Sequence, residues 1–390
     1  MNKKIKKILP WLVILYPTLT LLSTSLSESL LFIGLGLYLY LIFTKQMKFE
    51  YPPFFIPILF YIFFSILSAF FSYIPSVSLV DMKEVFLYLS IPFVYTVLKN
   101  NREFLSKISD LFFYFIILSS GFSAYQFVRL TVKHSGSPRA TGFEGHYMTQ
   151  AGIMMILAIY SLTIILEKKD YKNYKLELLF ILSSFTLILT LTRSAWFGFF
   201  LSLVFILFKK KPVSILLIPL FAIFLYLLSP ASVQNRIKSL TNIKDITFQE
   251  RIIMIKKGFK MIKAKPFFGV GPNMVRSAYT VPRYRVAKKE KLNPHLHNNF
   301  IQIWAERGSF AFLSWLWFIL LVFIKLLKIK NDTPLALYKW VAVFILIGFL
   351  GAGLFEYNFG DSEIKLLLLF FISIPFIGET NEHGKNIKKI

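Results

Sequence analysis

The sequence predicts an all-α, polytopic membrane protein, and three observations support this. Hydrophobic residues make up 56% of the chain and charged residues only 17%, with a mean hydropathy of +0.61. The apolar residues gather in repeated runs of roughly 17–25 residues, the length of a helix that crosses a bilayer. These runs are continuously apolar, whereas the strands of a membrane β-barrel would alternate apolar and polar residues. We therefore expect about twelve transmembrane helices.

The expected helices follow one another through short connections, except at one point. The first follows four lysines, and because no small-residue cleavage site comes after it, we expect it to be retained rather than removed as a signal peptide. The fourth is short and is broken by Pro92. The twelve cover approximately residues 9–26, 29–44, 54–73, 84–98, 110–132, 147–166, 176–192, 194–208, 213–229, 309–327, 336–355 and 364–377.

The basic residues predict how the chain is oriented. Most Lys and Arg of the short loops fall on one side of the membrane, for example Lys209, Lys210 and Lys211. Because positively charged short loops stay in the cytoplasm, we expect both termini there. One integral domain would then contain nine helices in 1–229, an outer loop in 230–297, and three helices with a cytoplasmic tail in 298–390.

The outer loop is long and strongly basic. Its 68 residues include fifteen Lys and Arg but only three acids, in a chain whose net charge is +25. A loop of this length is usually functional or disordered. The charge favours anionic partners and membrane lipids, and no nucleic-acid-binding module is recognisable. Between Glu250 and Lys265 the sequence predicts a short basic amphipathic helix at the membrane surface, ended by Pro266. Its apolar residues at helical spacing are Ile252, Ile255, Phe259 and Ile262.

Two histidines at the end of this loop are candidates for proton transfer, because imidazole titrates near neutral pH. His295 follows Pro294 and could be an exposed loop residue. His297 lies nearer the next helix, and Asn298 beside it could orient the imidazole or bind sugar hydroxyls. His-x-His alone is weak evidence for metal. The chain has no cysteine and no Asp-x-Asp pair, so we expect neither a metal nor another cofactor.

Arginines on the same outer face are candidates for binding phosphate, since the planar guanidinium grips two phosphate oxygens at once. Arg193 lies between two expected helices with almost no loop, and an arginine at membrane depth normally has a functional reason. Arg251 looks locally like an ordinary solvated residue. Arg139 and His146 lie in a glycine-rich loop that is either a simple turn or a charged cluster. The roles of Glu144, Glu356, Asp361 and Glu363 stay open between solvated loop charges and site residues.

Three sequence features together carry a family resemblance. They are Leu-Thr-Arg-Ser-Ala-Trp around Arg193, Arg251 ahead of Lys-Pro-Phe-Phe-Gly-Val-Gly-Pro-Asn, and His297-Asn298 followed by Gly308. In combination they resemble the O-antigen ligase and O-antigen polymerase superfamily of bacterial envelope glycosyltransferases, most closely the ligases. The resemblance is specific over residues 139–315. It departs from the family at Ala311, where a second glycine usually follows Gly308 in a Gly-x-x-Gly pattern.

The resemblance implies a reaction at the periplasmic face of the bacterial inner membrane. The donor would be an undecaprenyl-diphosphate-linked glycan, and the acceptor a hydroxyl of lipid A-core. Carried over by position, His297 matches the catalytic histidine, while Arg193 and Arg251 match arginines that bind the diphosphate. Direct displacement without a metal would invert the anomeric carbon. Further candidates for substrate contact are Arg139, His146, His295 and Asn298.

Several alternatives share these residues. An O-antigen polymerase would use the same donor but extend another lipid-linked repeat, and related enzymes attach glycans to proteins or capsule. A lipid-linked oligosaccharide flippase or another transporter is a different class. We disfavour it because no charged residue clearly interrupts the middle of an expected helix, whereas proton-coupled transporters usually carry such charges.

Overall fold

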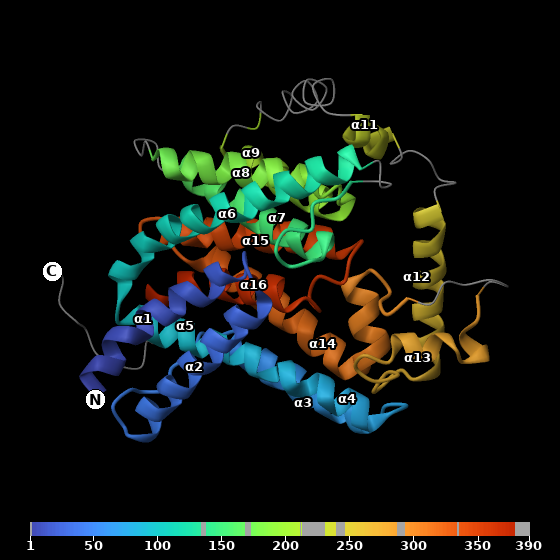
Figure 1. Cartoon of the computed structure of the whole chain (residues 1–390). Coiled ribbons are helices and arrows are strands. Elements are labelled where there is room, and N and C mark those ends of the chain that lie inside the picture. The colour runs from blue at the N-terminus through green and yellow to red at the C-terminus, as the bar shows by residue number, and fades with distance from the viewer. Residues whose placement is uncertain are drawn as a thin grey trace.

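The computed structural model describes residues 2–133, 138–167, 173–210, 212, 231–238, 246–286, 293–333 and 335–378. All regular secondary structure in these ranges is helical, as the sequence predicts (Figure 1). The first part contains α1 (Asn2–Leu19), α2 (Thr24–Phe43), α3 (Phe55–Phe70), α4 (Pro75–Asp81), η1 (Met82–Leu89), α5 (Ser90–Lys99), η2 (Arg102–Phe104), α6 (Leu105–Val132), α7 (Tyr147–Glu167), α8 (Tyr174–Leu189) and α9 (Arg193–Lys210). The rest contains α11 (Ala231–Lys238), α12 (Ile246–Ala264), α13 (Val275–Tyr279), η4 (Pro282–Tyr284), α14 (Asn299–Lys328), α15 (Ala336–Gly353), α16 (Ser362–Ser373) and η5 (Ile374–Gly378).

The helices support a multi-pass membrane protein without fixing the number of spans. Five described helices are long and apolar enough to cross a bilayer. They are α2, Arg102–Val132, α7, α14 and α15. The expected ninth helix, 213–229, lies outside the described residues, so the count of twelve stays a prediction.

Two expected boundaries are wrong. The first helix was expected to run to residue 26, but α1 ends at Leu19 and α2 begins at Thr24, with Ser23 as its N-cap. The hydroxyl of Ser23 accepts a bond from Leu26 N and so satisfies an orphan backbone donor. The second error concerns Pro92, which does not break a helix. It lies in the first turn of α5, where proline is tolerated, and the preceding residues form the 3-10 helix η1.

Helices α7, α15 and α16 form the core of the bundle. In α16 every residue from Glu363 to Ser373 is buried, and in α7 every residue from Thr149 to Ser161 is buried. A helix that is apolar and buried all round has no face left for solvent or lipid. Around this core α9 packs on α15, α8 on α7 and α6, α3 on α14, and α2 on α1 (Figure 1).

Contacts between helix ends show that the bundle has two chemically different ends. At one end, lysines at the ends of α8 and α9 pair with Asp110 on α6 and Glu167 on α7. Tyr338 at the start of α15 also donates to Leu105 O there, at 3.1 Å. The opposite end carries α12 and α13 beside the first half of α14 (Figure 1). The lysines that pair with Asp110 and Glu167 therefore lie apart from α12 and α13.

Helix α12 confirms the predicted helix, and the protein buries part of it. Met254, Lys257, Met261 and Ile262 are buried, and Lys257 is fully covered, with Nζ 3.7 Å from the centre of the Tyr279 ring. Phe259, from the predicted apolar face, is 45% exposed. The predicted apolar residues are therefore divided, because Ile262 is buried, Ile252 and Ile255 are half-buried, and Phe259 remains at the surface. A lysine was not expected in the core, but a cation over an aromatic ring tolerates partial desolvation.

A kink at Gly308 divides α14. Gly308 has φ 76° and ψ 179°, a conformation that essentially only glycine adopts. The segment 266–271 crosses the kink and replaces the missing helical bonds. Ser309 N donates to Pro266 O at 2.8 Å, and Val270 N donates to Ala305 O at 2.9 Å. We call this set of contacts the clasp. The expected start of the tenth transmembrane helix at residue 309 is wrong, because α14 begins at Asn299 and only its kink lies at this point.

Alanine at Gly308 should break the clasp. A Cβ there would lie 2.0 Å from Phe267 O and would also have to occupy the forbidden backbone region. We expect Gly308→Ala to lower the free energy of unfolding by about 2–4 kcal/mol. The measurement is thermal unfolding in detergent, followed by intrinsic fluorescence. Gly36→Ala is the matched control, because a Cβ at Gly36 meets nothing within 4 Å. Equal effects of the two substitutions would contradict the role of the clasp.

A pair of carboxyl groups joins three helix ends at the same end of the bundle. The hydroxyl of Thr24 lies 2.7 Å from Glu144 Oε2 and also contacts Glu363. Burial raises the pKa of Glu144 to about 7, and the nearby charge of Glu363 adds to the increase. Glu144 is therefore not the solvated loop charge that the sequence left open.

Glu144 should make stability depend on pH. Because its pKa is raised on folding, its contribution is present in acid and is lost as the pH rises through about 7. Between pH 6 and pH 8 the wild-type unfolding temperature should fall, and Glu144→Gln, which stays neutral, should remove part of that fall. We expect a difference of about 1 kcal/mol, since Glu144 is only half-buried. Parallel pH profiles for the two proteins would rule this out.

Candidate active site

His297 pairs with a carboxylate that lies 59 residues further along the chain. Its Nδ1 is 2.9 Å from both oxygens of Glu356, which follows the end of α15. His297 has φ 49°, in the left-handed region that histidine tolerates better than most residues. This turn ends the long loop and allows α14 to start two residues later. The structure therefore holds the imidazole in place from its Nδ1 side.

Glu356 is kept ionised by its surroundings. Burial alone would raise its pKa, but the hydrogen bond from His297, the backbone N–H of Tyr357 and the charge of Arg251 together hold the pKa below its usual value. Tyr357 N lies 3.1 Å from Glu356 Oε1. A charged carboxylate at Nδ1 favours a proton on Nδ1, which leaves Nε2 as the basic nitrogen.

Asn298 and Asn299 secure the start of α14. Asn298 Oδ1 accepts from Ile301 N at 2.9 Å as the N-cap, while its Nδ2 donates to Leu354 O at 2.8 Å. Asn299 is fully buried, and its Nδ2 donates to Asn358 Oδ1 at 2.6 Å. The sequence suggested that Asn298 could orient the imidazole or bind sugar. Both polar groups of its amide are engaged instead, one in capping α14 and the other in joining α14 to the end of α15.

Arg251 and Arg193 reach this end of the bundle from different helices. Arg251, half-buried on α12, is close enough for its charge to lower the pKa of Glu356. Arg193 is the first residue of α9. One turn later, the ring of Phe197 lies 5.4 Å from the ring of Phe355, the neighbour of Glu356. The fold therefore brings both arginines to the end of α15 where the His297–Glu356 pair lies.

Arg139 and His146 meet on one aromatic ring. The Arg139 guanidinium lies 4.3 Å from the centre of the Tyr147 ring, and the exposed His146 ring stacks on the same ring at 5.1 Å. Tyr147 O accepts from Thr192, the residue before Arg193, at 3.4 Å. The glycine-rich loop is therefore a charged cluster beside Arg193, which was one of the two readings that the sequence left open.

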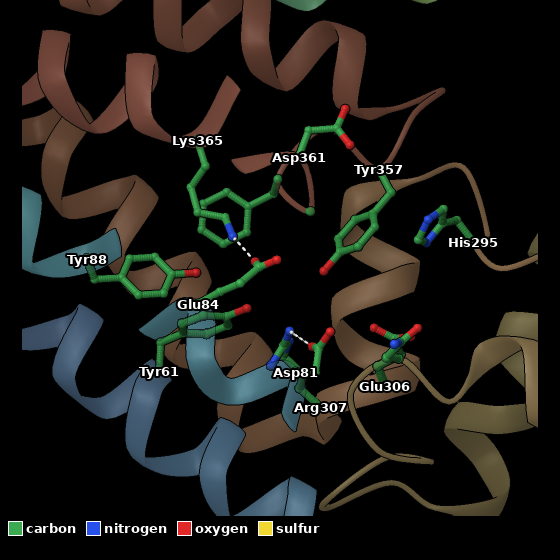
Figure 2. Close-up of a pocket in the computed structure, with 13 residues that line it drawn as sticks. Tyr61, Asp81, Glu84, Tyr88, His295, Glu306, Arg307, Tyr357, Asp361 and Lys365 are labelled. Carbon is green, nitrogen blue, oxygen red and sulfur yellow. Dashed lines mark hydrogen bonds and ion pairs between the residues drawn. The ribbon is translucent and has the colours of Figure 1, made fainter. Parts of the chain in front are cut away.

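His295 lines a cavity of about 160 Å³ (Figure 2). Burial lowers the pKa of His295, and the nearby His297 and His146 act in the same direction, against the charges of Glu356 and Asp81. Its ring lies 5.6 Å from that of Tyr357. His295 is therefore a neutral, half-buried wall residue rather than an exposed loop histidine.

Several residues of this cavity were missed from the sequence. Glu306 and Arg307 interrupt the apolar part of α14 immediately before Gly308, and Lys365 lies in α16. The argument that no charge interrupts a helix was therefore incomplete, although these charges lie near one helix end. Charged residues in an apolar run are a signal for a functional site that could have identified them. The described residues contain no group of three or more His, Cys, Asp or Glu arranged to hold a metal ion.

Comparison with known proteins supports the assignment of this region. No curated protein matches the chain. Residues 178–316, however, match the family described as O-antigen ligase. The matched segment contains Arg193, Arg251, His297 and the kink at Gly308, while Glu356 and Asp361 lie beyond it. The chain therefore carries an O-antigen ligase family domain, characteristic of O-antigen ligase- and polymerase-type glycosyltransferases, at residues 178–316.

Proposed function

We propose that the protein transfers an O-antigen glycan from undecaprenyl diphosphate to a hydroxyl of lipid A-core, at the periplasmic face of the bacterial inner membrane. The observation that carries the proposal is the His297–Glu356 pair, with Nδ1 2.9 Å from the carboxylate, at the helix end that also receives Arg193 and Arg251. A base and a set of cations on one face suit a reaction that deprotonates a hydroxyl and releases a diphosphate.

His297 is the general base in this proposal. Glu356 holds Nδ1–H, and Nε2 takes the proton of the acceptor hydroxyl as its oxygen attacks the anomeric carbon. The bond from that carbon to the diphosphate oxygen breaks as the new glycosidic bond forms, so the anomeric configuration inverts. The proton remains on His297 until product release. Glu356 stabilises the imidazolium that forms, because the two charges are adjacent.

The arginines stabilise the leaving diphosphate. Arg193 and Arg251 each offer a planar set of donors that stays charged at any relevant pH. Donors fixed in advance at developing negative charge are among the largest contributions to catalysis. Arg139 lies beside Arg193 through Tyr147 and is a third candidate for the same anion. In this arrangement the protein supplies the positive charge from its own side chains.

A reconstituted transfer assay tests the function. The full chain, an undecaprenyl-diphosphate glycan and lipid A-core are combined in detergent or liposomes without added metal. Glycan appearing on lipid A-core supports the ligase. Longer glycan that remains on undecaprenyl diphosphate would make the protein a polymerase and would refute the proposed acceptor. Absence of transfer to both acceptors would refute the proposal in either form.

Substitution of His297 should lower turnover more than substitution of its partner Glu356. His297→Ala should lower kcat about a hundredfold to ten-thousandfold, because the base is lost. Glu356→Gln should lower kcat by roughly tenfold to a thousandfold, since a glutamine N–H at Nδ1 would favour the wrong tautomer. Glu50→Gln is the matched control, because Glu50 pairs with Lys99 elsewhere in the bundle. Unchanged turnover in folded His297→Ala would remove the general-base role.

Lysine in place of Arg193 or Arg251 should show whether the donor needs the planar guanidinium or only a positive charge. Arg193→Lys and Arg251→Lys each keep a positive charge but lose the planar pair of donors. We expect the KM for the lipid-linked donor to rise about tenfold or more in each variant. Arg276→Lys, at an exposed position on α13, is the control and should retain the wild-type KM. Equal KM values for the donor in the wild type and the three variants would show that neither Arg193 nor Arg251 binds the diphosphate through two N–H donors at once.

A further inference from the structure

The cavity beside His297 differs in chemistry from the arginine cluster. Its walls come from α3, α4, η1, α14 and the segment from Tyr357 to Lys365, which the sequence separates widely (Figure 2). We propose that this cavity binds an uncharged sugar ring of a substrate glycan and excludes an acidic one. The proposal rests on the glycosyltransferase function above and names a specificity site within it.

Ion pairing inside the cavity is the first argument. Arg307 Nη2 lies 3.5 Å from Asp81 Oδ2, and Lys365 Nζ lies 2.8 Å from Glu84 Oε2 (Figure 2). Both permanently charged cations of the wall are thus already balanced by a carboxylate. An acidic sugar entering the cavity would have to displace one of these carboxylates or remain unbalanced in a partly buried space.

The remaining titratable groups of the wall add no free positive charge. Burial raises the pKa of Asp361 well above its usual value, and the charges of Glu356 and Glu363 act in the same direction. Burial lowers the pKa of His295. Burial therefore favours the neutral form of both groups, and in that form each can donate or accept hydrogen bonds. Groups that are neutral but polar match sugar hydroxyls, which both donate and accept.

Aromatic side chains give the cavity an apolar side. The rings of Tyr61 and Tyr88 lie 5.9 Å apart, and both lie within 6.3 Å of the ring of Phe359. The hydroxyls of Tyr88 and Tyr357 point into the cavity from opposite sides (Figure 2). A sugar ring has apolar C–H faces and a polar rim, so a site with ring faces and hydroxyls satisfies both.

Two buried nitrogen atoms in this wall have no hydrogen-bond partner within the described part of the chain. They are Nε of Arg307 and Nδ1 of His295. Buried polar atoms are generally hydrogen-bonded, so each indicates a place for water or a ligand hydroxyl. The volume of about 160 Å³ is sufficient for several water molecules at about 30 Å³ each, which bound sugar hydroxyls can replace.

The position of the cavity ties it to the proposed reaction. His295 in its wall is two residues from His297, and Tyr357 directly follows Glu356. A ring held here would lie next to the general base, while the diphosphate would lie at the arginines. The ring could belong to the acceptor or to the donor glycan, and both sources share the chemistry that the cavity recognises.

Saturation-transfer NMR on the full chain in detergent tests the proposal without requiring transfer. The probes are methyl glucoside and methyl glucuronide, which differ only in the carboxylate at carbon 6. The glucoside should receive saturation from the wild-type protein and the glucuronide should receive much less. Equal binding of the two probes, or binding of neither, would overturn the proposal.

Three substitutions locate the binding. Tyr61→Phe and Asp361→Asn should each weaken glucoside binding about threefold to tenfold, as expected for one lost hydrogen bond. Glu84→Gln should increase glucuronide binding, because it releases Lys365 from its partner; a purely structural role of Glu84 would not change this selectivity. Tyr338→Phe and Asp110→Asn, at the other end of the bundle, are the matched controls. Glucoside binding that is unchanged in both cavity variants would place the sugar elsewhere.

The transfer assay then identifies the source of the sugar. A higher KM for lipid A-core in Tyr61→Phe assigns the cavity to the acceptor, and a higher KM for the lipid-linked glycan assigns it to the donor. Unchanged KM values for both would overturn the proposal. Sugar binding that persists in a protein without transfer activity would refute only the proposed function, whereas active transfer without sugar binding would refute only the cavity assignment.

Discussion

The arrangement of the site depends on the clasp between residues 266–271 and the kink of α14. At Gly269 and Gly308 the backbones of the two segments come so close that a side chain at either position would collide with the other segment. A Cβ at Gly269 would lie 2.3 Å from Glu306 O, just as one at Gly308 would meet Phe267 O. Ser68 on α3 adds bonds to Phe268 O and Glu306 O, at 2.5 and 3.0 Å. The clasp thus fixes α12, α3 and both halves of α14 together.

This constraint has consequences for the chemistry nearby. The kink exposes backbone groups that a straight helix would use internally, and the clasp satisfies them, as a buried backbone requires. Glu306 and Arg307 immediately precede the kink and line the cavity, while His297 lies just before the start of α14. The opposite end of the first half-helix is held by Asn299 and Asn358. Both ends of the first half of α14 are therefore fixed. This suits an active site, whose side chains must be held in position before the substrate binds.

The sequence predicted the features that depend on local pattern. Apolar runs predicted most helices, and the helical spacing of apolar residues predicted α12. The family resemblance singled out His297, Arg193 and Arg251 as site candidates. The pairing of His297 with Glu356 could not be derived, because it joins residues 59 positions apart. The burial of Lys257 was also unpredictable, since its cover is the ring of Tyr279 on another element. Sequence periodicity identifies an apolar face, but only the tertiary structure decides whether that face meets protein or lipid.

The distribution of charge bears on the choice between a transferase and a transporter. A transporter exposes its binding site alternately to two sides, which requires polar groups along a path through the bundle. Here α7 and α16 are buried and mostly apolar through their middles. Ser161 and Ser373 donate to Leu157 O and Leu369 O of their own helices, and the hydroxyl of Tyr160 pairs with that of Ser109 on α6. The ion pairs Arg307–Asp81 and Lys365–Glu84, the His297–Glu356 pair and the Thr24 carboxyl contacts all lie at one end. A closed core with the candidate site at one end favours chemistry at one membrane face, which the proposed transfer between two lipid-anchored substrates requires.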